Sequence, residues 1–106
     1  MQSRMQPEMI MPMRVFDGRQ IAAARALANV SVIELARAAG VTPRTIGRLE
    51  IDAAISVSPR RRHGHVSKST FDKIVAALGE RGVEMVDEGD DHGAGVRWTL
   101  PRARRT

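Results

Sequence analysis

The chain has 106 residues, the length of a single domain with one modest hydrophobic core. Its formal charge is +5, and all but two of its 17 basic residues are arginine, the cation suited to bidentate contacts with phosphate and guanine. The lack of cysteine excludes disulfides and thiolate chemistry, and no apolar run approaches the roughly 18 residues that cross a bilayer. We therefore expect a cytoplasmic protein with a polyanionic partner, no membrane contact and no enzymatic activity, since no catalytic or phosphate-loop pattern is present.

We interpret residues 1–16 as a disordered N-terminal tail. Five of the six methionines fall in this segment, and Pro7 and Pro12 interrupt any helical period. The alternative is an apolar arm that binds a partner.

Residues 17–79 have the periodicity of helices. The first helix is predicted over residues 19–28. It opens at Asp17 or Gly18, and its apolar stripe consists of Ile21, Ala24, Leu27 and Ala28. Ser31 begins a second helix through a capping box with Glu34, and Gly40 ends that helix because glycine adopts positive φ without strain. The inner face of the second helix consists of Leu35, Ala36 and Ala39.

Two further helices have clear start signals. Thr42 caps a third helix, with Pro43 at its first position, and this helix runs through Glu50. Ser67 opens a fourth helix. Its buried stripe is predicted to be Phe71, Ile74, Val75 and Leu78, and its stop Gly79 or Gly82.

A β-hairpin is predicted over residues 80–100, with strands at 83–86 and 96–100 around a glycine-rich segment. The hairpin either caps the core or pairs edge to edge with a second subunit. The residues available to cap the core are Val83, Met85, Val86 and Trp98.

The charge of the chain is unevenly distributed. Residues 1–79 hold twelve basic and six acidic side chains, whereas residues 80–106 hold five basic and six acidic ones. A basic tail, residues 101–106, carries Arg102, Arg104 and Arg105. The acidic hairpin is therefore expected to face away from a polyanion, which contacts the helical part.

Residues 32–51 have the spacing of a helix-turn-helix, in which two helices pack at a steep angle across a tight turn. Close approach of the helices needs a small side chain in the first, which is Ala36. The turn needs a residue that tolerates positive φ four positions later, which is Gly40. Apolar side chains fill the angle between the helices, namely Leu35, Val41, Ile46 and Leu49.

The third helix has an outward face that suits DNA. With Ile46 and Leu49 in the core, the outward residues are Arg44, Thr45, Gly47 and Arg48. Arginine in the major groove bonds guanine O6 and N7 together, and Thr45 suits a thymine methyl or a phosphate. Gly47 is explained either by close approach to DNA or by tight helix packing, and Thr42 either by capping alone or by capping with phosphate binding.

Four groups of residues resemble the XRE-type family, the Cro and phage-repressor-like DNA-binding domains. They are Ser31-x-x-Glu34-Leu35-Ala36, Ala39-Gly40-Val41-Thr42, Thr45-Ile46-x-Arg48-Leu49-Glu50 and Ser67-x-x-Thr70-Phe71-x-Lys73-Ile74-x-x-Ala77-Leu78. The resemblance covers residues 21–79 and implies a mostly α fold, a lambda-repressor-like bundle of four to five helices, here followed by the β-hairpin. It also implies that the third helix enters the major groove and that Arg25 and Glu50 form a structural ion pair.

The sequence departs from the family pattern at two places. Val32 stands where many members have a glutamine that holds the DNA backbone. The crossing from the third to the fourth helix is a long basic loop, residues 51–66. We expect its three consecutive arginines to lie along phosphates or in the minor groove, the alternative being a solvated loop; they are Arg60, Arg61 and Arg62.

From these observations we expect a sequence-specific DNA-binding transcriptional regulator of a bacterium or phage. The expected partner is double-stranded DNA, bound as a homodimer on an inverted repeat with half-site centres roughly 34–36 Å apart. Repression is the expected outcome, with no cofactor, metal or small-molecule ligand. The alternative is a protein-binding module, such as an antiactivator or an antitoxin-like partner, and Val32 and the acidic hairpin favour it.

Overall fold

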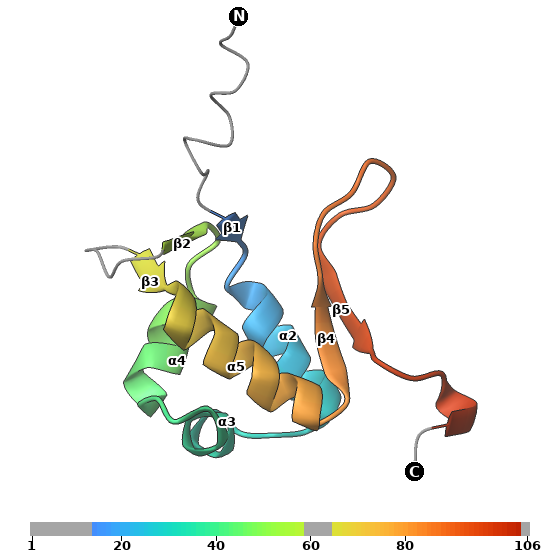
Figure 1. Cartoon of the computed structure of the whole chain (residues 1–106), viewed down its shortest axis with the longest axis horizontal. Coiled ribbons are helices and arrows are strands. Elements are labelled where there is room, and N and C mark those ends of the chain that lie inside the picture. Colours follow the sequence, from blue (N-terminus) through green and yellow to red (C-terminus); the bar gives the residue numbers. More distant parts are fainter. Residues whose placement is uncertain (1–13, 59–64, 105–106) are drawn as a thin grey trace, which may run out of the picture.

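The computed structural model describes residues 14–58 and 65–104 (Figure 1). The described part contains four α-helices, namely α2 (Arg19–Ala28), α3 (Val32–Ala39), α4 (Pro43–Glu50) and α5 (Lys68–Glu80). It also contains the strands β1 (Arg14–Phe16), β2 (Ile55–Ser58), β3 (His65–Ser67), β4 (Val83–Val86) and β5 (Gly95–Trp98), followed by a short 3-10 helix η2 (Arg102–Arg104). The fold is mostly α, as predicted. None of the described helices is long and apolar enough to span a bilayer.

The predicted start and stop of α3 are confirmed. The Ser31 hydroxyl accepts the Glu34 amide at 3.0 Å, and the Glu34 carboxylate accepts the Ser31 amide at 2.7 Å. These two bonds satisfy amides that the first helical turn leaves without partners. At the other end Gly40 has φ 73° and donates its amide to Arg37, which ends the helix.

α5 begins where the sequence predicts, but one residue of its predicted buried stripe is wrong. Ser67 caps the helix by accepting the Thr70 amide at 3.1 Å, and the chain turns away at Gly82, which has φ 81°. Val75 was expected in the core, yet it is 36% exposed. Successive residues of a helix are about 100° apart, so Val75 lies outside the face formed by its buried neighbours. That face consists of Phe71, Ile74, Ala77 and Leu78.

One hydrophobic core joins all four helices. Ile21 and Ala24 of α2 are buried, whereas Leu27 and Ala28 are partly buried against the same core. α3, α4 and α5 contribute their buried faces to the same core. The ring of Phe16 packs on that of Phe71, with centroids 4.6 Å apart. The largest fully buried side chains are Ile21, Leu35, Ile46, Leu49, Ile55, Ile74, Leu78 and Val83.

A three-stranded sheet corrects two of the predicted boundaries. β1 pairs antiparallel with β2, and β2 pairs parallel with β3. The predicted tail therefore ends before Arg14, and residues 1–13 lie outside the described residues. The predicted loop over residues 51–66 contains β2 and most of β3. Both were missed because strands this short are held by distant partners and carry little alternation of their own.

Gly18 holds this sheet close to the helices. Its amide donates to the Asp52 carbonyl at 2.9 Å. A Cβ at this position would lie 1.7 Å from the Leu49 carbonyl oxygen, so glycine is required for the close approach of the two backbones. Leu49 lies in the last turn of α4, and Asp52 lies in the short connection from α4 to β2.

The C-terminal hairpin is confirmed, with β5 at Gly95–Trp98 rather than over residues 96–100. Val83 is fully buried, and Met85 and Trp98 pack against the core, so the hairpin caps it. The buried Gln20 side chain joins α2 to both strands, because its amide donates to the carbonyls of Val86 at 3.2 Å and Gly95 at 3.0 Å. The hairpin lies on the side of the molecule opposite α4 (Figure 1).

Candidate nucleic-acid interface

α3 and α4 form a tight corner in which the predicted packing residues Leu35, Ile46 and Leu49 are buried, whereas Val41 is partly buried against the same core. The chain turns through residues 40–42, and the Val41 amide donates to the Ala36 carbonyl at 3.0 Å. Ala36 is buried with Leu35 on one side of the corner, and Ile46 and Leu49 are buried on the other. Because its buried side is fixed in this way, α4 must present its remaining residues outward.

The first turn of α4 is capped as predicted. Thr42 accepts the Thr45 amide at 3.1 Å, and the two hydroxyl oxygens are 3.0 Å apart. Pro43 occupies the first helical position, where its missing amide costs no hydrogen bond. Thr42 is exposed and Thr45 is half-buried.

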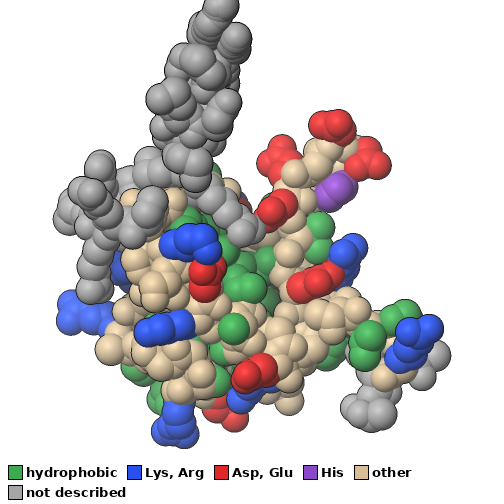
Figure 2. Space-filling model, in the orientation of Figure 1, with side chains coloured by type: hydrophobic (Ala, Val, Ile, Leu, Met, Phe, Trp, Pro, Cys, Tyr) green, Lys and Arg blue, Asp and Glu red, His purple; other side chains and the backbone are tan. Residues whose placement is uncertain are grey.

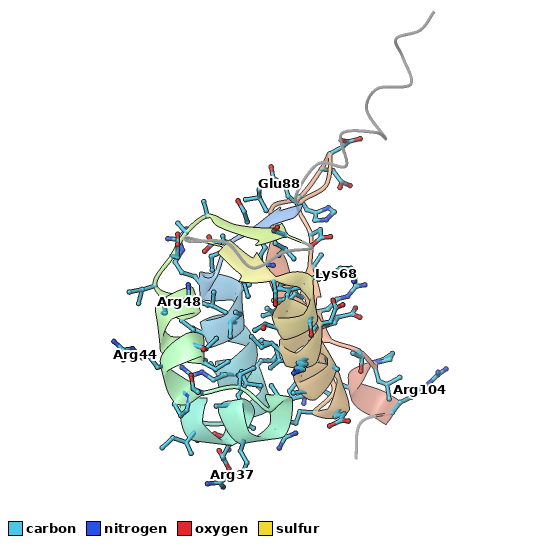
Figure 3. The ribbon with its side chains drawn as sticks, turned by 60° about the vertical axis from the view of Figure 1, so that its left-hand side comes forward. Arg37, Arg44, Arg48, Lys68, Glu88 and Arg104 are labelled. Carbon is cyan, nitrogen blue, oxygen red and sulfur yellow. The ribbon has the colours of Figure 1, made fainter. Side chains whose placement is uncertain are left out.

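The outward residues form one surface, which we call the α4 face: Thr42, Arg44, Thr45, Gly47 and Arg48. Arg44 and Arg48 are exposed and one helical turn apart, and Arg44 projects away from the body in Figure 3. No salt bridge to either is found among the described residues. Two unpaired guanidiniums on one side of a rigid helix are free to bind an external anion or base edge.

Gly47 faces open space. A Cβ added there would have no heavy atom within 4 Å beyond its own neighbourhood in the helix. Of the two explanations that the sequence leaves open, tight packing against the described residues is therefore excluded. Glycine costs about 1 kcal/mol relative to alanine in a helix interior, and no internal contact compensates for that cost.

A hollow of about 200 Å³ lies between the α4 face and the start of α5. We call it the α4–α5 hollow. The capping residues of both helices, Thr42 and Ser67, line it, together with Thr45 and Thr70 from the same first turns. Two cations, Arg48 and Lys73, complete its polar lining.

The electrostatics of this hollow favour an anion. Helix N-termini carry a partial positive charge, and two such termini meet here beside two cationic side chains. Sequence reasoning did not place Ser67, Thr70 and Lys73 in the interface. A repeated pattern marks Ser67 and Thr70: a hydroxyl residue three positions before a threonine occurs at Thr42 and again at Ser67.

The ion pair expected between Arg25 and Glu50 is present. Arg25 Nε and Nη2 donate to the two Glu50 carboxylate oxygens at 2.6 and 2.9 Å, and Nη1 donates to the Val30 carbonyl at 3.2 Å. Hydrogen bonding to Glu50 raises the pKa of Arg25 above its ordinary value. The side chains are only 21% and 11% exposed, so the pair ties α2 to the end of α4 rather than serving a ligand.

The two departures from the family pattern are Val32 and the basic crossing after α4. Val32, the departure from the family pattern, is half-buried and packs against the core. Arg60, Arg61 and Arg62 lie outside the described residues. The strands on either side are described, however, and Ser58 at the end of β2 is paired with Ser67 at the mouth of the α4–α5 hollow.

A group of acidic side chains lies away from this interface, at the tip of the hairpin, whereas α4 lies on the other side of the molecule (Figures 1 and 2). Glu50, at the end of α4, is paired with Arg25. A comparison with models of protein families finds no match, and a comparison with curated proteins finds none either. The function of the α4 face is therefore inferred from its geometry and charge.

Proposed function

We propose that this protein is a cytoplasmic, sequence-specific DNA-binding transcriptional regulator in which α3 and α4 act as a helix-turn-helix. The observation that carries the proposal is the pair Arg44 and Arg48, which are exposed and form no salt bridge with any described residue, on a helix whose opposite side is buried. A helix of this kind fits the major groove, where each arginine can bond guanine O6 and N7 together. The same assignment makes the four helices a lambda-repressor-like bundle.

The α4–α5 hollow supports the proposal because it supplies an anchor for the DNA backbone beside the reading helix. The positive ends of α4 and α5 favour a phosphate there, and Arg48 and Lys73 supply the cations that would bind it. Arg48 lines the hollow and also belongs to the α4 face. A phosphate held there would fix the position of Arg48 relative to the base pairs.

Gly47 supports close contact between α4 and the groove. The open space above it lets the backbone of α4 approach a duplex further than a side chain would permit. Thr45 follows the same face and reaches either a thymine methyl or a phosphate. The predicted phosphate contacts of Arg60, Arg61 and Arg62 remain part of the proposal.

We propose further that the protein binds an inverted repeat as a homodimer and represses transcription by occluding polymerase. Half-site centres are then one helical turn of DNA apart, roughly 34–36 Å. The resemblance to repressors in residues 21–79 is the basis for this part of the proposal.

The test begins by selecting duplexes that the protein retains from a random pool. Affinity for the selected and for random DNA is then measured at two salt concentrations. Arg48→Ala is expected to weaken binding to the selected sequence about 5- to 150-fold and to random DNA much less. Lys73→Ala is expected to weaken both equally and to flatten the salt dependence.

Arg81→Ala is the matched control. It removes the same charge from an exposed position just after α5, about 12 Å along the helix axis from Lys73, and should leave both affinities unchanged. Failure to retain any duplex at low salt would refute the proposal. If Arg48→Ala lowered the affinity for selected and for random DNA equally, Arg48 would contact phosphate and not a base.

The alternative function is a protein-binding module, an antiactivator or antitoxin-like partner. Ile51, directly after α4, is 84% exposed, and Ile33 on α3 is 57% exposed. Exposed apolar side chains beside the α4 face favour a protein partner over a phosphate backbone. Substituting both by serine would then abolish partner binding, whereas DNA affinity, where it exists, would be unchanged.

A further inference from the structure

A cleft of about 550 Å³ lies between β1 and the loop of the C-terminal hairpin. We call it the hairpin cleft. Val15 and Asp17 line it on the β1 side, and Asp87, Glu88 and Ala94 line it on the hairpin side. A second hollow of about 230 Å³ adjoins it and continues between α2 and β5. Together they form an elongated groove, a shape that suits an extended peptide.

β1 presents an open strand edge on this side of the molecule. The three-stranded sheet has the order β1-β2-β3, so β1 pairs with one described strand only, and its other side faces the hairpin (Figure 1). In an antiparallel pair, successive residues alternate between bonding to the partner strand and directing their main-chain groups away from it. At least one of the three residues of β1 therefore directs its amide and carbonyl outward. An extended peptide can add to such an edge as a further strand.

The side chains beside this edge combine an apolar surface with a free negative charge. Val15 is 60% exposed although it is a large apolar residue within a strand. Glu88 is exposed and forms no salt bridge with any described residue. The Asp17 carboxylate is already held by Arg19 at 2.6 Å. A cation brought by a ligand would therefore meet Glu88, and an apolar side chain would meet Val15.

We propose that the hairpin cleft binds an extended peptide segment of a partner protein, which adds to β1 as a strand and places a lysine or arginine at Glu88 and an apolar side chain on Val15. In strand addition the main-chain hydrogen bonds supply affinity, and the contacts of alternate side chains supply specificity. Charge complementarity favours a basic peptide over a nucleic acid here, because the carboxylates of the hairpin repel phosphate.

This proposal goes beyond DNA binding and does not depend on it. None of the residues that line the hairpin cleft belongs to the α4 face. The cleft also lies at a different side of the molecule from α4 (Figure 1). A single copy of the chain could therefore hold DNA and the peptide at the same time, which would bring the partner protein to the bound DNA.

The test uses two labelled peptides, one that alternates valine with lysine and one that alternates valine with threonine. Each is titrated with the full chain without DNA and followed by fluorescence anisotropy. The lysine peptide should bind with a Kd below about 1 mM, about two- to fivefold more tightly than the threonine peptide, as for an exposed ion pair. Because the chain has a net charge of +5, nonspecific electrostatics oppose this preference and cannot produce it.

Two variants, each with a matched control, examine the two side-chain contacts. Glu88→Gln should remove the preference for lysine, whereas Glu80→Gln, at an exposed position at the end of α5, should keep it. Val15→Ser should weaken both peptides about tenfold, because their apolar contact is lost. Val75→Ser, at an exposed position on α5, should change neither affinity. Circular dichroism checks that each variant is folded.

Hydrogen exchange locates the bound peptide. The lysine peptide should slow exchange of at least one β1 amide and leave α4 unchanged. The proposal would be overturned by an absence of binding at about 1 mM, by unchanged affinities of both Glu88→Gln and Val15→Ser, or by protection elsewhere. It would also be overturned if β1 became protected on concentrating the protein alone, which would indicate a second copy in the cleft.

Two further measurements distinguish this site from other parts of the molecule. A chain without residues 1–13 should bind the lysine peptide like the full chain; a gain of more than about tenfold would assign the cleft to the chain's own N-terminal segment and refute a partner protein as its ligand. Arg48→Ala should lose DNA affinity and retain peptide affinity, so failure of the DNA proposal and failure of the peptide proposal give different results.

Discussion

Gly47→Ala should raise stability and lower DNA affinity at the same time. The added methyl group meets no heavy atom within 4 Å in the free protein, so it introduces no clash. Replacing glycine by alanine in a helix interior gains about 1 kcal/mol. For a domain of this size, that gain corresponds to a rise in Tm of roughly 4–8 °C.

The same methyl group would project from the α4 face toward the bound duplex. Forcing one extra carbon into a close interface costs about 1–3 kcal/mol, so affinity for the selected DNA should fall about tenfold or more. Thermal unfolding followed by circular dichroism measures the first effect, and a DNA titration of the same preparation measures the second.

Gly79→Ala provides the control for this prediction. Gly79 lies in α5, and a Cβ added there also meets nothing within 4 Å. This variant should be stabilised by a similar or smaller amount, because it is near the helix end, and should bind DNA like the wild type. A stabilised Gly47→Ala protein with undiminished DNA affinity would refute the assignment of Gly47 to the interface.

Three further predictions concern the fold itself. Gly18→Ala should cost about 3 kcal/mol in urea unfolding, because its Cβ would overlap the Leu49 carbonyl oxygen; a loss below the error of the measurement would contradict the close approach. Glu50→Ala should cost about 2 kcal/mol, because it leaves the mostly buried Arg25 guanidinium without its carboxylate, whereas an exposed pair would cost less. Hydrogen bonding to Ser31 lowers the pKa of Glu34. The ionised carboxylate therefore stabilises the fold at pH values above the ordinary carboxyl pKa, and this contribution is lost as the pH falls below it. The gap in Tm between the wild type and Glu34→Ala should therefore narrow in acid.

The helices could be predicted closely because their signals are local. Each of α3, α4 and α5 is preceded by a capping residue whose side chain accepts an amide of the first turn, namely Ser31, Thr42 and Ser67. Such caps are visible in a few consecutive residues and predict where each helix begins. The predicted end of α2 at Ala28 is confirmed as well. Asn29 follows as the C-cap with φ 59°, a left-handed conformation that asparagine tolerates.

The small sheet could not be predicted because each of its strands depends on a partner far along the chain. Phe16 is buried because β1 reaches β2, nearly 40 residues later, and because the Phe71 ring covers it. Neither contact leaves a pattern within a short window. The same reason explains why Lys73 and Thr70 were missed, since they meet residues of α4 that lie far from them along the chain.

The β2–β3 pairing is what assembles the interface from separate parts of the chain. Because Ser58 lies opposite Ser67, the parallel pair sets the start of α5 at the point where β2 ends. Neighbouring strands are about 4.8 Å apart, so the chain leaves Ser58 within one strand spacing of a residue that lines the α4–α5 hollow. Residues that the sequence separates into a helix, a long crossing and a second helix therefore meet at one place, and the long crossing is the element that brings them together.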